Sequence, residues 1–235
     1  MYKKVLYSIT VILILLSIYV IANSSIQIKE MVELIAVCVY LLIFLYYSKV
    51  RDKMIFYAFI LFMVTDILGL FYSENIVSKI IPIIRVLAYL IFARRIMNKF
   101  ELLKGNKYIL FFFFIVITLN VLLLYNIILG NSTPLIDNTD QLLFFFFGIL
   151  LIAMSSMSVN YNFRYNSKRS LYFLYFIFAF IIADVAWFIA SFIEQTFSSY
   201  LDTVAYIIAL MFMVRYAVET EEKDDVLLES DNEFK

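Results

Sequence analysis

The chain has 235 residues, of which 64% are hydrophobic and 16% charged, and its 19 lysines and arginines balance its 19 aspartates and glutamates. Soluble domains are about 45–50% apolar, so this composition predicts an all-α, polytopic membrane protein. A net charge of zero gives no indication of nucleic-acid binding. The chain has no histidine and a single cysteine, Cys38, which excludes histidine-ligated metals, intramolecular disulfides and cysteine-held clusters. Acid–base chemistry is left to Asp, Glu, Lys, Arg and Tyr, and we expect neither a metal nor a cofactor.

Eight apolar runs are each long enough to span the about 30 Å hydrocarbon core of a bilayer. In chain order they cover residues 5–22, 31–47, 54–72, 80–97, 108–127, 141–159, 171–193 and 199–218. The first run lacks a small-residue cleavage site, so it is interpreted as a span and not as a signal peptide. We expect one eight-helix transmembrane domain over residues 1–218, followed by an acidic, disordered cytoplasmic tail over residues 219–235.

Positive charge is concentrated on one side of the predicted membrane domain. The connectors on that side hold Lys3, Lys4, Lys49, Arg51, Lys53, Arg94, Arg95, Lys99, Lys104, Lys107, Arg164, Lys168, Arg169, Arg215 and Lys223. The opposite connectors hold Lys29 and Lys79. Because cationic loops stay in the cytoplasm, both termini are predicted to be cytoplasmic. The richness in Ile, Phe, Asn and Lys favours a bacterial plasma membrane.

Two aspartates lie well inside apolar runs, Asp66 in the third and Asp184 in the seventh. A carboxylate inside a bilayer costs a few kcal/mol or more unless it is paired or protonated, so both are candidates for function. Two carboxylates that face one low-dielectric cavity can share a proton and supply an acid and a base together. We therefore predict Asp66 and Asp184 as a catalytic pair, with the two roles unassigned. Metal binding is a minor alternative because no further ligands are spaced on one face.

The two aspartates also belong to a weak internal repeat. They are 118 positions apart, the offset that also pairs Phe62 with Phe180, and an offset of 117 pairs Tyr89 with Tyr206. Each half would contain an even number of spans, so the halves would run parallel, and sites in such proteins lie between the repeats. We predict two parallel four-helix repeats over residues of about 1–100 and 101–218.

Further polar and aromatic side chains in the apolar runs are predicted to line one outward-opening cavity and to bind the substrate. They are Glu33, Arg85, Tyr89, Asn120, Trp187, Asp202 and Tyr206. For Glu33 and Asp202, an exposed polar belt at the lipid interface is the alternative. Arg85 has three interpretations: an ion pair with Asp202, a fork that holds a phosphate, or a side chain that reaches the interface without a partner.

The sequence resembles the lysoplasmalogenase-like YhhN family of membrane proteins in its layout and in two segments. The stretch Ser170 to Tyr206, with Ala183-Asp184 inside an apolar run, resembles the family's C-terminal signature, and Phe62 to Leu68 resembles its N-terminal aspartate segment. The resemblance implies hydrolysis of the vinyl ether bond of a lysoplasmalogen, which gives a fatty aldehyde and a glycerophospho-base. It also implies that the aspartate pair performs the reaction while Arg85 holds the phosphate.

Two other classes of function stay open at this point. One is a carrier or binder of a small amphiphile that uses the same cavity without catalysis. The other is a membrane anchor or sensor whose aspartates only hydrogen-bond between helices. For the hydrolase and for the carrier, the partner is a membrane lipid or lysophospholipid. The oligomeric state is left open.

Overall fold

A computed structural model describes residues 2–23, 26–48, 52–71, 75–97, 138–193 and 196–219, together with 114, 117–118, 121–122 and 125. The helices it defines are α1 (Tyr2–Asn23), α2 (Ile26–Tyr47), α3 (Lys53–Gly69), α4 (Asn75–Met97), α6 (Asn138–Tyr165), α7 (Lys168–Ile193) and α8 (Thr196–Val218). All regular structure in these residues is helical, which confirms the predicted all-α class. The predicted fifth run, residues 108–127, lies largely outside the described residues, as does the tail after Glu219.

The apolar composition of the helices suggests a membrane protein. In the described part of the chain, four helical segments are long and apolar enough to cross a bilayer: Tyr2–Asn23, Thr139–Tyr165, Lys168–Ser191 and Phe197–Val218. The helix α3 has 17 residues, which corresponds to about 25 Å at the rise of an α-helix and is slightly less than a typical hydrocarbon core. By length and composition, the described residues therefore support four spans and not the eight that the sequence predicts.

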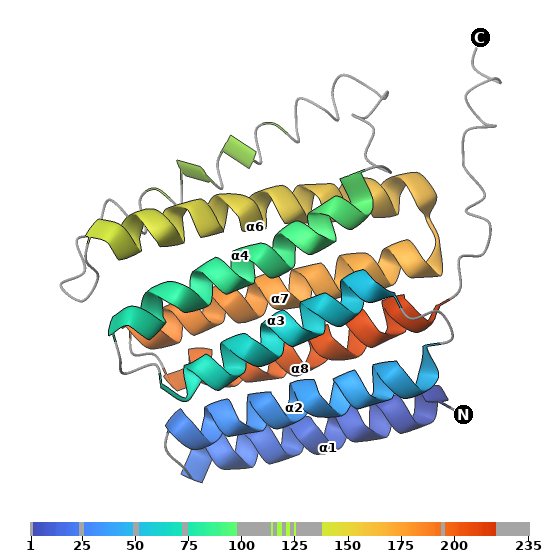
Figure 1. Cartoon of the computed structure of the whole chain (residues 1–235), viewed down its shortest axis with the longest axis horizontal. Helices are drawn as coiled ribbons and strands as arrows, with labels where there is room; N and C mark the ends of the chain where they lie inside the picture. Colours follow the sequence, from blue (N-terminus) through green and yellow to red (C-terminus); the bar gives the residue numbers. More distant parts are fainter. Residues whose placement is uncertain are drawn as a thin grey trace.

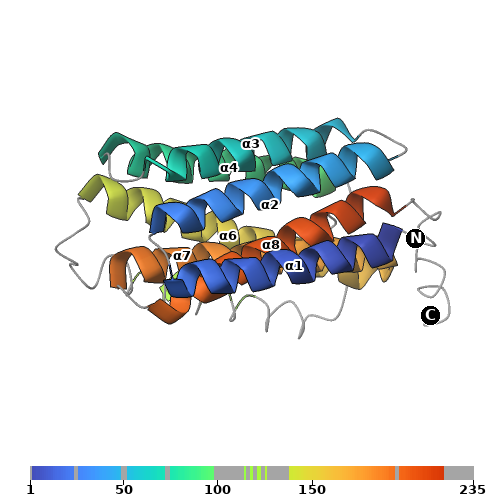
Figure 2. The same cartoon turned by 90° about the horizontal axis from the view of Figure 1, so that it is seen from below.

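The helices run side by side along one direction in two perpendicular views (Figures 1 and 2). The hairpin of α7 and α8 has the most extensive contact; α8 also packs against α1 and α2, and α4 packs between α3 and α6. The helix α1 begins at the same end of the bundle at which α8 ends (Figure 1). That end also carries the starts of α3 and α7 and the end of α4, where most of the basic residues lie.

Local signals in the sequence explain several helix boundaries. Asp52 caps α3, because its side chain accepts a hydrogen bond from the Met54 backbone N–H at 3.1 Å. After α6, Asn166 has a φ of 39°, a left-handed conformation that asparagine tolerates better than most residues. Ser167 and Ser170 then cap the start of α7 reciprocally, each side chain accepting from the other's backbone N–H at 3.1 and 3.0 Å. These devices let α6 and α7 form a tight antiparallel pair.

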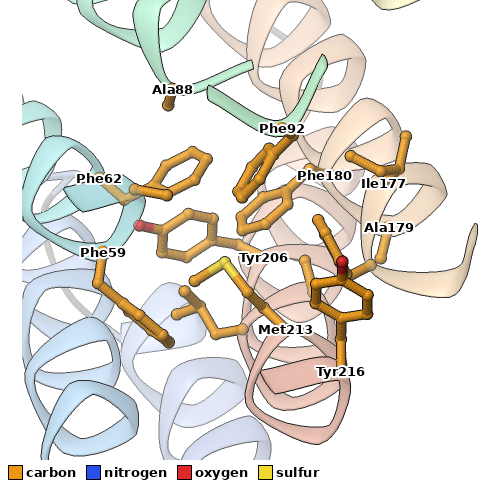
Figure 3. Close-up of a cluster of buried hydrophobic side chains, with 14 of the residues drawn as sticks. Phe59, Phe62, Ala88, Phe92, Ile177, Ala179, Phe180, Tyr206, Met213 and Tyr216 are labelled. Atoms are coloured by element: carbon orange, nitrogen blue, oxygen red, sulfur yellow. The ribbon is translucent and has the colours of Figure 1, made fainter. Parts of the chain in front are cut away.

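The centre of the bundle is an aromatic core in which the two halves of the chain meet (Figure 3). Phe62 of α3 and Phe180 of α7 stack with ring centroids 4.4 Å apart and planes inclined by 5°. Phe92 of α4 and Tyr206 of α8 pack around this pair at centroid distances of 6.3 and 6.2 Å from Phe62. The stack brings α3 and α7 together at one defined point.

Replacing Phe62 with alanine is expected to lower the unfolding free energy by about 2 kcal/mol. The loss comes from packing alone, because lipid is as apolar as the protein core and adds no hydrophobic contribution. The measurement is unfolding by sodium dodecyl sulfate in mixed micelles. A double-mutant cycle with Phe180→Ala should give a coupling of about 0.5–1.5 kcal/mol, as expected for an aromatic pair. Phe146→Ala is the control, since this α6 ring is 65% exposed. A coupling close to zero would show that the stack has no energetic role.

Candidate functional site

The two aspartates predicted as a pair lie on helix faces that meet. Asp66 is one helical turn beyond Phe62 and Asp184 is one turn beyond Phe180, so each shares a face with a ring of the central stack. Both side chains are buried inside the bundle, with 2% and 4% of the residue surface exposed. The stacked rings bring α3 and α7 into contact at this point.

Asp66 is bound by a tyrosine from the other half of the chain. The Tyr206 hydroxyl donates to Asp66 Oδ2 at 2.7 Å. The adjacent Thr65 hydroxyl donates to the Phe62 carbonyl of its own helix at 2.7 Å, so it does not compete for the carboxylate. No cation forms an ion pair with Asp66 among the described residues, although the charges of Arg85 and Glu33 lie near enough to act on it.

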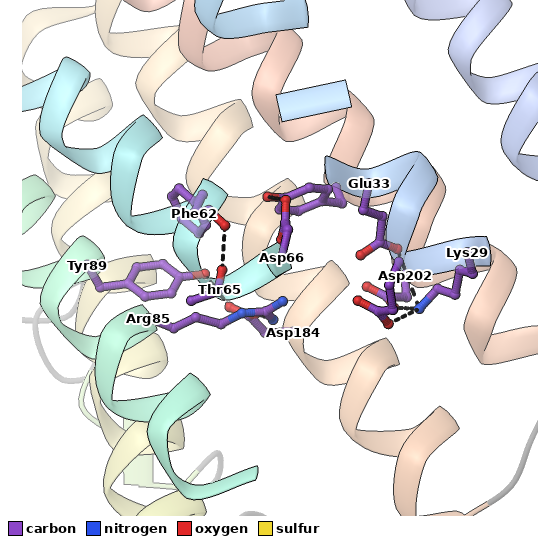
Figure 4. Close-up of polar contacts among 11 residues, drawn as sticks. Lys29, Glu33, Phe62, Thr65, Asp66, Arg85, Tyr89, Asp184 and Asp202 are labelled. Carbon is purple, nitrogen blue, oxygen red and sulfur yellow. Dashed lines mark hydrogen bonds and ion pairs between the residues drawn. The ribbon is translucent and has the colours of Figure 1, made fainter. Parts of the chain in front are cut away.

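Asp184 has a different environment, because a cation binds it directly (Figure 4). Arg85 Nη1 forms an ion pair with Asp184 Oδ1, and the Tyr89 hydroxyl donates to Asp184 Oδ2 at 2.5 Å. The Arg85 guanidinium also lies over the Trp187 ring, 5.5 Å from its centroid. Charge-assisted hydrogen bonds of this kind favour the ionised form of a carboxyl group. Asp184 is therefore suited to be the carboxylate of the pair.

Of the three interpretations of Arg85, the ion pair with Asp202 is corrected by the structure, because Arg85 pairs with Asp184 and Asp202 pairs with Lys29. The physical reason is that the rotation of each helix, which is set by packing, turns Arg85 toward α7 and not toward α8. Arg85 is also 7% exposed, so it does not reach the interface without a partner.

A second charged group lies beside the aspartates, between α2 and α8 (Figure 4). The Lys29 ammonium forms an ion pair with Asp202 Oδ2 and is 3.4 Å from Glu33 Oε1 and 3.8 Å from Glu30 Oε1. The Thr203 hydroxyl donates to Glu33 Oε1 at 2.5 Å. Glu33 and Asp202 are 2% and 1% exposed, so they do not form an exposed belt at the lipid interface.

Sequence reasoning counted Lys29 only as a charge of an outer connector and did not single out Glu30. The i, i+4 spacing of Lys29 and Glu33 at the start of an apolar run is the signal that could have identified this group. Glu30 lies against the end of α3, where a Cβ on Gly69 would come within 2.5 Å of Glu30 Oε2. The absence of a side chain at Gly69 therefore allows this close approach.

Acids outnumber bases in the combined cluster. It contains five carboxylates, of Glu30, Glu33, Asp66, Asp184 and Asp202, and two cations, of Lys29 and Arg85. An uncompensated buried negative charge is costly, so a proton on one of these carboxyl groups would lower the cost within the part of the cluster that the structure describes. Asp66, which has a tyrosine and no cation as its direct partner, is the natural holder of one of them.

The predicted site residues thus fall into one connected region, with one exception. Trp187, Tyr89 and Tyr206 are buried beside the aspartates, while Asn120 lies outside the described residues. Within the described ranges, no group of three or more His, Cys, Asp or Glu residues has a geometry that could hold a metal ion. No protein-family model, curated protein or solved structure matches this chain. The assignment of a function therefore depends on the geometry and the chemistry of the cluster.

Proposed function

We propose that the chain is an integral membrane protein of eight spans with both termini in the cytoplasm, in a bacterial plasma membrane. The end of the bundle that carries both the start of α1 and the end of α8 supports an even number of crossings (Figure 1). The helix α4 finishes at one end of the bundle and α6 starts at the other end. The chain must therefore cross once between them, which also supports an even number of crossings. The predicted run 108–127 lies between them in the sequence and would supply the fifth span.

The proposal includes two parallel four-helix repeats. In its support, the Asp66–Tyr206 bond becomes the Asp184–Tyr89 bond when each residue is replaced by its predicted equivalent. Helix contacts follow the same exchange. In the predicted repeat α2 corresponds to α6 and α8 to α4, and both the α2–α8 and the α6–α4 contacts are present. Both Asp–Tyr bonds connect one half of the chain to the other. The cluster would then be a site between repeats, which is where parallel-repeat membrane proteins place their sites.

The function that this geometry supports best is hydrolysis of a lysophospholipid-like amphiphile. The observation that carries it is the unequal environment of two buried carboxyl groups, since Asp184 is bound by Arg85 and Tyr89 whereas Asp66 is bound, among the described residues, by Tyr206. Pairs of carboxyl groups held in different protonation states are how hydrolases divide acid and base roles. We assign Asp66 as the acid and Asp184 as the carboxylate.

The substrate in this proposal is a lysoplasmalogen, in keeping with the resemblance to the YhhN family. Asp66 transfers its proton to the vinyl carbon that is not bonded to oxygen, which leaves an oxocarbenium ion that the Asp184 carboxylate stabilises. Water adds to the charged carbon, and the hemiacetal collapses to a fatty aldehyde and a glycerophospho-base. A proton released from the water restores Asp66. Arg85 acts as a positioning residue that keeps Asp184 ionised, in place of the predicted phosphate fork.

The test is aldehyde release by the purified protein from a lysoplasmenyl lipid in detergent micelles. Asp66→Asn and Asp184→Asn should each reduce the rate by about 100-fold or more, because each removes one of the two catalytic groups. Asp52→Asn is a control at the N-cap of α3, since asparagine is an equally good helix cap. It removes an ion pair with Arg95 but no group of the aspartate cluster, so it should keep the wild-type rate. Activity that survives in either aspartate variant would refute the pair. A folded wild-type protein that exchanges the lipid without cleaving it would favour the carrier.

A further inference from the structure

A buried arginine at the basic end of the bundle, far along α8 from the aspartate cluster, is bound by two tyrosines. Arg215 lies in the last turn of α8 and is 6% exposed. Its Nη1 donates to the Tyr7 hydroxyl of α1 and its Nη2 donates to the Tyr172 hydroxyl of α7. The guanidinium carbon also lies 4.2 Å from the ring centroid of Tyr172 and 5.4 Å from that of Tyr7. Three helices therefore converge on one guanidinium.

Arg215 has no counter-ion among the described residues, in contrast to the other buried cations discussed above. Arg85 pairs with Asp184 and Lys29 pairs with Asp202, whereas no carboxylate lies within ion-pair distance of Arg215. Arg215 Nε, which is also buried, has no hydrogen-bond partner. Glu219, one turn beyond Arg215, acts on Tyr172 through its charge but forms no ion pair with Arg215. A buried arginine without a direct ion pair is costly in a bundle within a membrane, so an anion at this position would relieve that penalty.

The surroundings of Arg215 offer two hydrogen-bond donors to such an anion. They are the hydroxyls of Tyr7 and Tyr172, because a hydroxyl that accepts a bond from Arg215 still has its own proton to donate. A guanidinium supported by neutral donors is a group that recognises the several oxygens of a phosphate well.

The position of the group indicates where the phosphate comes from. Tyr7 is 44% exposed and lies on a face of α1 with the exposed apolar residues Val11 and Leu15, a face suited to contact with lipid chains. Tyr7 is about 8 Å along α1 from Tyr2, by the rise of an α-helix, so it lies close to headgroup level. Basic pockets between transmembrane helices on the cytoplasmic side are typical binding sites for anionic lipid headgroups.

We propose that Arg215, Tyr7 and Tyr172 form a phosphate-binding site for an anionic phospholipid of the cytoplasmic leaflet. The site is separate from the aspartate cluster and does not depend on the hydrolase proposal. Lipid bound there would link α1, α7 and α8, the three helices that contribute these side chains.

The experiment uses the full-length protein in a neutral detergent and counts bound lipid by native mass spectrometry during a titration with phosphatidylglycerol. A parallel titration uses inorganic phosphate, with the thermal unfolding midpoint as the readout. We expect Arg215→Gln to weaken phosphatidylglycerol binding by about fivefold or more, the effect of removing one basic contact near the headgroups. Tyr7→Phe should weaken it less, since one neutral donor is lost. Phosphate binding that depends on Arg215 in the second titration alone would assign the site to a soluble phosphate.

The matched control is Arg94→Gln, which removes the same charge from an exposed position in the last turn of α4. It should bind phosphatidylglycerol as the wild type does. Equal weakening by Arg94→Gln and Arg215→Gln would show a general charge effect and overturn the proposal. Unchanged binding in Arg215→Gln would overturn it as well. If Arg215→Gln does not fold, Tyr7→Phe decides the question, because it keeps the arginine and removes one exposed hydroxyl; wild-type binding in that variant would reject the site.

Discussion

Asp184→Ala is expected to lower the unfolding free energy by about 3–5 kcal/mol, the cost of removing one partner from a buried ion pair. The substitution leaves the Arg85 guanidinium buried at 7% exposure without its carboxylate. It also removes the acceptor of the Tyr89 hydroxyl. The measurement is the midpoint of unfolding by sodium dodecyl sulfate in mixed micelles, supported by the thermal midpoint in detergent.

The double variant Arg85→Met/Asp184→Ala tests why the single variant is unstable. It distinguishes the loss of the attraction between the two charges from the cost of leaving Arg85 buried without a partner. Replacing both partners of a buried pair with apolar residues is often neutral, so we expect most of the stability to return. Arg85→Met alone should be as harmful as Asp184→Ala, since it leaves Asp184 with only Tyr89. A double variant no more stable than Asp184→Ala would contradict the idea that the penalty comes from the uncompensated arginine.

Lys29→Met is the second substitution with a large expected effect, again about 3–5 kcal/mol. Lys29 is the cation at the centre of Glu30, Glu33 and Asp202, so its loss leaves three carboxyl groups close together. Like charges at short range cannot all remain ionised in a low dielectric, and the protein must bind protons or move the helices apart. The same unfolding assay measures the loss.

The control for Lys29→Met is Lys4→Met, which removes the same charge from an exposed position on α1. It should change stability by less than about 0.5 kcal/mol, as surface substitutions usually do. If Lys29→Met is as stable as Lys4→Met, the ammonium does not hold α2 and α8 together. Adding Asp202→Asn to Lys29→Met should restore part of the stability, because it removes one of the unpaired carboxyl groups.

The positions of the helices could be predicted from the sequence because a span is defined by the length of an apolar run alone. The run 80–97 lies within α4 and the run 199–218 within α8, whereas the run 54–72 extends a few residues beyond the end of α3 at Gly69. Helix ends are less predictable because caps and tight turns, such as Asn166 and its neighbours, decide them locally. The aspartates were also identifiable, since an acid deep in an apolar run is conspicuous.

The partners of the charged side chains could not be predicted in the same way. Whether Arg85 meets Asp184 or Asp202 depends on the rotation of each helix and on its neighbours, and both are set by tertiary packing. Lys29 shows the same limit, because its position near the end of a span suggested a loop charge although the structure buries it at 5% exposure. The predicted repeat pairs Phe62 with Phe180, which stack, but the same alignment does not predict which charged side chains meet.

The exchange of tyrosines between the halves has a consequence for how unequal aspartates could arise. In a dimer of two identical four-helix units, Asp66–Tyr206 and Asp184–Tyr89 would be the same bond made twice, and both aspartates would have the same neighbours. One gene for both subunits would place an arginine beside both or beside neither. Once the two units are joined in one chain, each half can change independently, and Arg85 can pair with Asp184 while its counterpart position holds an acid, Asp202. In the repeat that we propose, joining the halves in one chain is what lets Arg85 bind one of the two aspartates and not the other.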